Sequence, residues 1–448
     1  MTKKECGAKI VTVGTLHNPR KTHNLRWWIA AMLFASTAIN YMDRQTLSLL
    51  APYLKVSYHW TNSDYANLVI AFRVAYAVGQ TICGRWMDRV GTRVGITLSV
   101  FFYSLVSILT PLANGLLGFM GFRLMLGLGE SANWPAATKA VSEWFPAKER
   151  ALATAFFDSG SSVGGALSPF VVLWIYMHWG WRPAFIVPGV LGFIWLLVWR
   201  RFYHAPEQHP NISSGELEML RQEKQSYEDT SGGRNARWRD LLKLPQTWGV
   251  ISARAFTDPV WYFVTDWFPI YLVAKGIDLR NGLIAIWIPF LAADLGNFAG
   301  GAASGYLIRR GWPLGRSRKA VVVAGGLGTM LLIPSVFTQN LWLITLLFAT
   351  ATFSYACFST IANVLPSDLY KSNTVATVSG LSGTAASIGT IIAMKFVGYL
   401  SDARTMKAGH AFDPVVIAGG IIPMIGVILV LMLVRNTRAT REGLVRPI

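Results

Sequence analysis

The chain has 448 residues, of which 52% are hydrophobic and only 14% are charged, and it contains 18 Trp and 24 Phe. A soluble domain is usually about one quarter charged, so this composition excludes an ordinary string of soluble domains and indicates an integral membrane protein. The net charge of +18 would suggest nucleic-acid binding in a soluble chain. Basic loops beside membrane spans account for it here, and no nucleic-acid partner is expected.

Long apolar stretches follow one another along the chain. Each approaches or exceeds the roughly 20 residues that cross a ~30 Å hydrocarbon core as a helix. The polar segment 204–243 separates the first six stretches from the last six. The twelve predicted spans are 27–50, 63–86, 94–113, 116–139, 151–175, 183–199, 247–274, 283–308, 320–337, 341–365, 375–400 and 415–434.

The first apolar stretch is a span and not a signal peptide. It is longer than the roughly 7–15 apolar residues of a signal, and no small-residue cleavage pattern follows it. The chain is therefore predicted to be an all-α integral membrane protein. Its predicted organisation is a tail at 1–26, a six-helix bundle at 27–202, a central loop at 203–246, a second six-helix bundle at 247–435 and a tail at 436–448.

The basic residues predict the orientation in the membrane. Most of the 41 Lys and Arg residues lie in segments that share one side of the membrane if both termini lie there. The positive-inside rule makes that side the cytoplasm. The polar central loop is expected to contain a short interfacial helix and a flexible segment. The basic segments are the N-terminal tail, 85–93, 139–150, the central loop, 309–319 and the C-terminal tail.

Ionisable residues inside the first two spans suggest a binding site, because such residues are expensive to bury and usually face a partner or a watery cavity. Asp43 and Arg44 are adjacent and lie about 100° apart around a helix, so both can border one cavity. Tyr41 precedes Arg44 by three residues, and Tyr76 follows Arg73 by three in the second span. Cations and hydroxyl groups of this kind are the donors that a carboxylate ligand needs.

The loop after the second span contains residues that could latch the cytoplasmic side of the protein in one conformation. It contains Gly84, Asp88, Arg89, Gly91 and Arg93. Glycine at position 91 permits a tight turn, and the aspartate can cap a helix end or pair with a cation. These five residues are predicted to form a gating loop on the cytoplasmic side.

The fourth span carries Arg123 and Glu130, which lie on one face of a helix two turns apart. Two interpretations are open. In the first, Arg123–Glu130 and Asp43–Arg44 are buried ion pairs that neutralise each other's charge. In the second, protonation of the acid frees an arginine for the substrate.

Later spans offer weaker candidates. Arg254, Asp258 and Tyr262 follow at four-residue steps, and an Arg254–Asp258 ion pair is preferred there over substrate contact. Trp261 and Tyr262 could stack against a sugar ring. Asp294 raises the same choice between pairing and substrate contact, although the glycines around it indicate close helix packing.

Small residues in the fifth and eleventh spans mostly indicate packing, but Ser162 and Ser387 are the hydroxyls best placed to contact a polyol. Cys6, Cys83 and Cys357 show neither metal-ligand spacing nor a disulfide framework. No metal site, cofactor or catalytic residue is expected, and no nucleophile or phosphate-loop motif indicates an enzyme.

The chain resembles a known transporter class. Residues 84–93 resemble the signature loop of the major facilitator fold, with a weaker counterpart at 305–311, as expected for two pseudo-symmetric six-helix bundles. The segments 39–45, 129–135, 142–150 and 257–262 resemble the anion:cation symporter family, most closely its bacterial hexuronate transporters, with galactonate transporters as relatives.

This resemblance implies proton-coupled import of a small organic anion across the bacterial inner membrane by a protein that works as a monomer. It also implies roles for four residues. Asp43 and Glu130 are the proton-coupling acids, Arg44 is the anion contact and Arg123 is an internal counter-ion. We expect a hexuronate such as galacturonate or glucuronate, because the segments 258–262 and 293–296 look like those of hexuronate members.

Two alternatives remain open. Some hexuronate members lack an acid at the position of Asp43, whereas galactonate-type members have the Asp-Arg pair, so an aldonate such as galactonate is the second candidate. A nutrient sensor that does not transport is a remote alternative. It would be expected to carry a large signalling domain, for which the two short tails leave no room.

Overall fold

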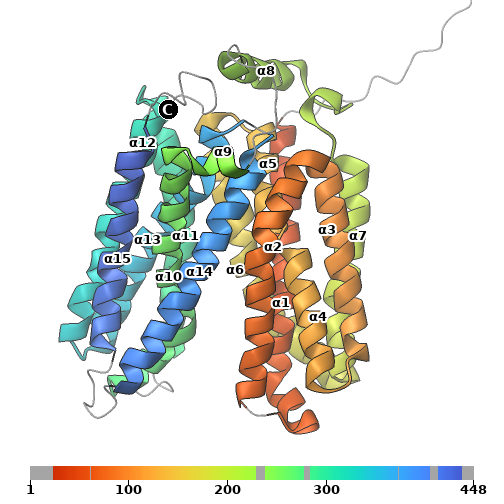
Figure 1. Cartoon of the computed structure of the whole chain (residues 1–448), viewed down its shortest axis with the longest axis vertical. Coiled ribbons are helices and arrows are strands. Elements are labelled where there is room, and N and C mark those ends of the chain that lie inside the picture. The colour runs from red at the N-terminus through yellow and green to blue at the C-terminus, as the bar shows by residue number, and fades with distance from the viewer. Residues whose placement is uncertain are drawn as a thin grey trace, which may run out of the picture.

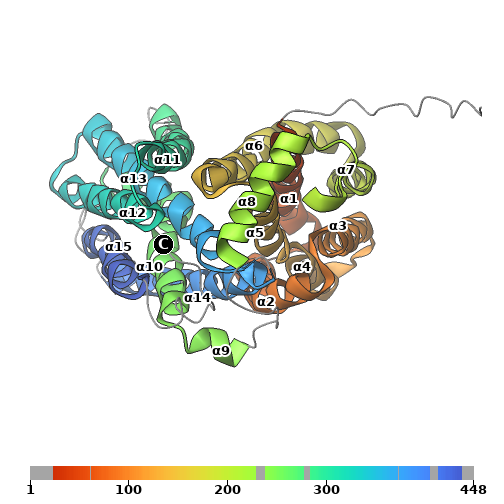
Figure 2. The ribbon, with the colours of Figure 1, turned by 90° about the horizontal axis from the view of Figure 1, so that it is seen from above.

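Two helical bundles stand side by side in a computed structural model of the protein (Figures 1 and 2). The structure describes residues 24–60, 62–228, 238–276, 283–371, 373–403 and 412–435. The predicted tails lie outside these residues, apart from 24–26 at the N-terminal side. The predicted all-helical fold class is confirmed by this architecture.

The N-terminal bundle is built from the helices that precede the central loop. In it α1 packs against α6, α2 against α4, and α3 against α7. Its helices are α1 (Leu25–Tyr58), α2 (Asn62–Val90), α3 (Thr92–Leu109), α4 (Gly115–Glu130), α5 (Asn133–Trp144), α6 (Ala147–Trp179) and α7 (Trp181–Phe202).

The C-terminal bundle follows the central loop. Its strongest pairings are α11 with α13, α10 with α14, and α10 with α15. Its helices are α10 (Pro245–Ala274), α11 (Leu283–Arg309), α12 (Leu314–Thr329), α13 (Leu341–Leu369), α14 (Val375–Ala403) and α15 (Asp413–Leu433). The central loop itself contains α8 (Ser214–Glu228) and the short α9 (Trp238–Leu242), whereas the predicted flexible stretch 229–233 lies outside the described residues.

The predicted span 116–139 is wrong as a single helix. The chain forms α4 up to Glu130 and starts α5 at Asn133, with a turn between them. The reason is Pro135, because a proline ring clashes with the carbonyl four residues earlier and lacks the N–H of a continuous helix. In the first turn of α5 the missing N–H costs nothing.

The predicted span 320–337 also differs from the structure. The α-helix α12 ends at Thr329, and the 3₁₀ helix η4 (Met330–Phe337) continues it with Pro334 inside. The predicted span 94–113 differs in the same way, because α3 ends at Leu109 and the 3₁₀ helix η1 (Thr110–Leu112) follows it. Each of the other predicted spans matches one helix, and most of them stop a few residues before the helix does. The largest difference is α1, which runs to Tyr58 rather than to residue 50.

Eight helices among the described residues are long and apolar enough to cross a membrane. The predicted spans outside this set correspond to α1, α4, α10 and α11. All four of these helices carry ionisable side chains in their interior, and α4 has only 16 residues.

The two bundles contact each other mainly through α2 with α14 and through α6 with α11. A side chain at Gly84 or Gly380 would collide with the opposite helix, because Gly84 faces the carbonyl of Ala376 and Gly380 faces that of Gln80. The bundles converge at the end of the molecule that carries α5, α8 and α9, and they diverge toward the other end (Figure 1). We refer to these as the closed end and the open end.

Candidate functional site

A cavity of about 740 Å³ lies between the bundles, within the range of about 300–1,000 Å³ that small-molecule sites occupy. It is lined by residues in the middle of α1, α2, α4, α6, α10, α11 and α14. Its charged lining residues are Arg44, Arg73, Arg123 and Asp294. The cavity therefore combines apolar walls with several cations and a carboxylate.

Arg44 is held on the cavity wall by aromatic rings and a carboxylate. Its Nε lies 2.6 Å from Glu130 Oε2, and the Glu130 side chain is fully buried. Its Cζ lies 4.9 Å from the ring centre of Tyr41 and 4.5 Å from that of Tyr76. Guanidinium groups stack favourably on such rings. Arg44, Tyr41 and Tyr76 all line the cavity, whereas Glu130 lies behind them.

Asp43 is buried beside this group but does not line the cavity. It is 2% exposed, and Ser107 Oγ donates a hydrogen bond of 2.8 Å to its Oδ1. Its Oδ2 has no hydrogen-bond partner among the described residues. A buried carboxylate oxygen without a donor is costly unless the group is protonated.

Arg123 does not form the ion pair with Glu130 that one interpretation of the sequence offered. It lines the cavity and is 5% exposed, and no hydrogen bond or ion pair joins it to a described residue. The pairing of Arg123 with Glu130, and that of Asp43 with Arg44, are both wrong for this structure. Arg44 projects from α1 toward α4, where it reaches Glu130 first.

The aromatic candidates of α10 lie in the cavity wall. Trp261 is stacked on Tyr355, with ring centres 6.0 Å apart, and it meets Phe290 edge-on. The guanidinium of Arg73 lies 5.2 Å from the ring centre of Tyr262, which joins α2 to α10 across the two bundles. Both predicted aromatic residues are therefore within reach of a molecule in the cavity.

The two candidate serines have different surroundings. Ser162 Oγ donates a hydrogen bond of 2.6 Å to Asp294 Oδ1 across the bundle interface. Ser387 Oγ donates to Gly383 O in its own helix, 3.0 Å away. Both line the cavity. Asp294 thus faces the cavity, a position that the surrounding glycines did not indicate from the sequence.

The predicted Arg254–Asp258 ion pair is present, with Arg254 Nη2 2.9 Å from Asp258 Oδ2. Both residues are buried, and neither lines the cavity. The preference for pairing over substrate contact at these two positions agrees with this geometry.

The predicted gating loop lies at the closed end, where Asp88 contacts the other bundle. Its carboxylate accepts hydrogen bonds from Thr377 N at 2.7 Å and Ala376 N at 3.2 Å, and it pairs with Lys139 Nζ at 3.0 Å. It therefore caps the N-terminus of α14 and also pairs with a cation. Gly91 has φ 81°, as a tight turn requires.

The remaining members of the loop have separate roles. Gly84 is buried in the contact with α14. Arg93 Nη2 donates to Arg200 O at 2.8 Å within the N-terminal bundle, and Arg89 is exposed.

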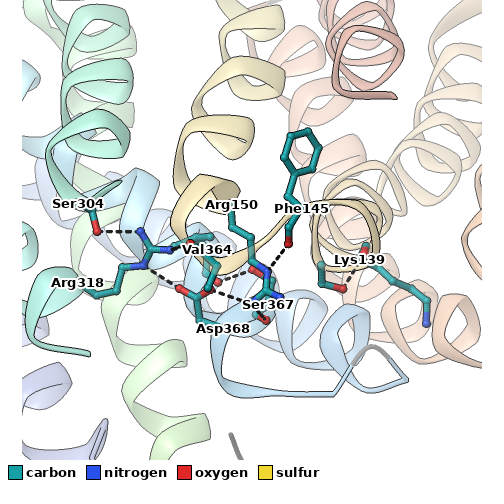
Figure 3. Close-up of polar contacts among 10 residues, drawn as sticks. Lys139, Phe145, Arg150, Ser304, Arg318, Val364, Ser367 and Asp368 are labelled. Carbon is teal, nitrogen blue, oxygen red and sulfur yellow. Dashed lines mark hydrogen bonds and ion pairs between the residues drawn. The ribbon is translucent and has the colours of Figure 1, made fainter. Parts of the chain in front are cut away.

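A second charge group at the closed end was not predicted (Figure 3). Asp368 of α13 lies between Arg150 of the N-terminal bundle, at 3.2 Å, and Arg318 of its own bundle, at 2.8 Å. Arg318 also donates to Ala147 O at 2.8 Å, so both arginines cross the bundle interface. From the sequence, both arginines were interpreted as orientation signals, and Arg150 also ends a segment that carries the family resemblance. No local pattern in the sequence links Asp368 to either arginine.

Among the described residues, no group of three or more His, Cys, Asp and Glu side chains could hold a metal ion.

Comparison with known proteins defines the class. The sequence model of the Major Facilitator Superfamily matches residues 33–394. The chain therefore belongs to the Major Facilitator Superfamily, and it is a multi-pass membrane transporter rather than an enzyme. The solved structure of a proton:xylose symporter has the same fold, with a TM-score of 0.71 at 14% identity, covering 91% of this chain and 96% of that one.

The curated relatives carry different substrate names. A hexuronate transporter of Escherichia coli K12 is 30% identical over 94% of this chain and 96% of its own length. A galacturonate transporter of Dickeya chrysanthemi is 33% identical over 63% and 82%. A probable galactarate/D-glucarate transporter of Escherichia coli K12 is 31% identical over 89% and 93%. The predicted family resemblance is confirmed by these similarities.

Proposed function

We propose that the protein imports a sugar-acid anion together with protons, and that the anion is a hexuronate such as galacturonate or glucuronate. One observation carries the proposal: Arg44 lines the cavity while its guanidinium is paired, at 2.6 Å, with the buried carboxylate of Glu130. Sugar-acid relatives at 30% and 33% identity support the substrate class.

The coupling follows from competition for one cation. A carboxylate ligand and the Glu130 carboxylate both need the guanidinium of Arg44. When Glu130 binds a proton, its hold on Arg44 weakens, and the guanidinium can bind the carboxylate of the substrate. When the substrate leaves, Glu130 can release its proton and pair with Arg44 again. Binding of the proton and of the anion are then linked with a favourable sign.

Asp43 is the second proton-binding acid in this proposal. Its Oδ2 is buried and has no hydrogen-bond partner among the described residues, so this oxygen is available to bind a proton. Arg123, predicted as an internal counter-ion, is free of ion pairs among the described residues and lies near both acids as a neighbouring positive charge. If two protons accompany one monoanion, net positive charge moves inward. The membrane potential then adds about 2.3 kcal/mol per charge per 100 mV.

The remaining cavity residues would bind the sugar. Tyr41, Tyr76 and Ser162 offer hydroxyl groups, and the rings of Trp261 and Tyr262 offer apolar faces. Ser387 contributes a hydroxyl from α14 that is engaged within its own helix.

Transport then proceeds by alternating access. The closed end faces the cytoplasm in this proposal, in agreement with the basic loops, and the two termini lie there in the bacterial inner membrane. The bundles 27–202 and 247–435, joined by the central loop, rock about the cavity as a monomer. The gating loop holds the closed end through Asp88, so its bonds to α14 must break before substrate reaches the cytoplasm.

The test is uptake of labelled galacturonate into proteoliposomes with an acidic outside, with galactonate and glucuronate as competitors. We expect accumulation above equilibrium that a protonophore abolishes. Uptake that only equilibrates the label would contradict proton coupling.

An aldonate such as galactonate is the second candidate substrate. The observation in its favour is Asp43, an acid next to Arg44 that is buried in the same charge group. If galactonate competes more strongly than either uronate, galactonate is the substrate, and the proposed symport mechanism is unchanged.

A further inference from the structure

Asp294 is the one carboxylate among the described residues that line the cavity, and its position has a consequence for the substrate. The arginines of the cavity come from α1, α2 and α4 of the N-terminal bundle, whereas Asp294 comes from α11 of the other bundle. The cavity is therefore cationic on one side and anionic on the other.

The charge of Asp294 is not neutralised by an ion pair to a described residue. Its partner is the Ser162 hydroxyl, 2.6 Å from Oδ1, and the residue is half-buried. Asp258 and Glu130 instead pair with arginines. Asp158, one turn before Ser162 on α6 of the N-terminal bundle, is close enough to Asp294 to interact with it electrostatically, so a further acid lies near Asp294 across the bundle interface.

We propose that Asp294 makes the cavity selective for sugar acids with one carboxylate over those with two. A substrate carboxylate that binds the arginines points the rest of a six-carbon chain toward α11. Hydroxyl groups at the far end can donate to the Asp294 carboxylate, whose oxygens are acceptors. A second carboxylate there meets a like charge in a partly desolvated site, which weakens binding by at least about tenfold.

This inference rests on the proposed function but goes further. The curated relatives include transporters named for monoacids and for the diacids galactarate and glucarate at about the same identity, 30% and 31%. Overall similarity therefore does not separate the two substrate classes, whereas a charge at one position in the cavity can. The prediction is that this chain takes a uronate or an aldonate and rejects an aldarate.

The experiment measures inhibition of galacturonate counterflow in proteoliposomes at about pH 7, where the sugar-acid carboxylates are ionised. Unlabelled galacturonate, galactonate and galactarate are the competitors. In the wild-type protein we expect galactarate to inhibit at least about tenfold more weakly than galacturonate. In Asp294→Asn, which keeps the shape and an oxygen for Ser162, we expect that ratio to fall by about tenfold.

The matched control is Ser162→Ala, which removes the partner of Asp294 but leaves the charge. This variant should weaken inhibition by galacturonate a few-fold and keep the discrimination against galactarate. Equal inhibition by galactarate and galacturonate in the wild-type protein would overturn the inference while supporting sugar-acid transport. So would an unchanged ratio in Asp294→Asn.

A failure of the proposed function gives a different result. In that case none of the three sugar acids would inhibit or be taken up. The wild-type ratio also keeps the inference testable if the asparagine variant fails to insert into the membrane.

Discussion

The charge groups of the cavity and of the closed end are built differently. In the cavity, Arg44 and Glu130 belong to the same bundle, and Arg44 faces open space. At the closed end, Asp368 binds arginines from both bundles, and all three side chains are at most 4% exposed.

The difference concerns what each group can exchange. An ion pair that borders a cavity can exchange one partner for a ligand or a proton, because the ligand or proton can reach the pair through the cavity. A group enclosed between two bundles can change partners only when the bundles separate. We infer that the cavity group senses protons and substrate, and that the closed-end group sets the conformation in which they bind.

The largest effect is expected from Arg44→Ala. Removing a buried partner of a charge pair costs about 2–5 kcal/mol, which is at least about 30-fold in Kd. We expect substrate binding, measured by scintillation proximity with labelled galacturonate, to be lost. Arg44→Lys is the control, because it keeps the charge but loses the planar group that stacks on Tyr76. If Arg44→Ala kept a near wild-type affinity, Arg44 would not contribute to substrate binding.

Glu130→Gln should separate coupling from transport. Glutamine cannot release a proton, so Arg44 stays available for substrate in every state. We expect counterflow exchange to persist while accumulation driven by a proton gradient disappears. Both are measured in the same proteoliposomes, by label exchange and by net uptake. Normal accumulation in this variant would show that another group couples the proton.

Asp368→Asn tests the closed end. Loss of a partner in buried ion pairs costs about 3–5 kcal/mol, enough to shift a two-state equilibrium. Ser48 lines the cavity. In a protein without other cysteines, the substitution Ser48→Cys places one thiol there. Labelling of this thiol by a membrane-impermeant reagent measures how accessible the cavity is from the open end. We expect labelling to fall at least about tenfold.

The matched control is Asp413→Asn, which removes the 3.3 Å ion pair with Lys275 inside the C-terminal bundle. It should leave labelling of the cavity unchanged. Equal labelling in both variants would mean that Asp368 does not hold the closed end.

The smallest effect is expected at His209, between α7 and α8. Burial lowers the pKa of His209 below its usual value of 6.5. The neutral ring accepts a hydrogen bond from Asn211 N at Nδ1, 3.2 Å away. The stabilisation by the neutral form is therefore complete above about pH 6.5 and is lost as the pH falls through the lowered pKa.

Relative to the intrinsic exchange rate, which itself slows as the pH falls, hydrogen exchange of the segment around Asn211 should accelerate at acid pH. His209→Gln, which cannot be protonated, should remove this acceleration. A pH dependence that survives in the variant would assign it to another group.

The fold was largely predictable because hydrophobic spans are a local property of the sequence. A run of about 20 apolar residues can satisfy its backbone in a bilayer only as a helix. The three departures, at Pro111, Pro135 and Pro334, arise where a proline changes the helix inside an apolar run. Proline positions were visible in the sequence, but which of them break a helix depends on what packs against it. Pro188 and Pro289 lie inside continuous helices.

The site was predictable only by residue type. Asp43, Arg44, Arg123 and Glu130 stood out because charged groups inside a span are costly. Their partners did not, because spacing along one helix favours partners on that helix, and the contact between Arg44 and Glu130 joins α1 to α4. The glycines around Asp294 indicated close helix packing, although the residue faces the cavity.

By itself the sequence determined that this protein is a helical membrane protein, which residues are polar inside it and which loops are basic, since each of these follows from side chains within about 20 residues. Only the tertiary structure decided which charges meet. The Arg44–Glu130 pair, the Ser162–Asp294 hydrogen bond and the Arg150–Asp368–Arg318 group each join residues from different helices. Interactions of this kind depend on how the helices pack, and no periodicity along the chain encodes that packing.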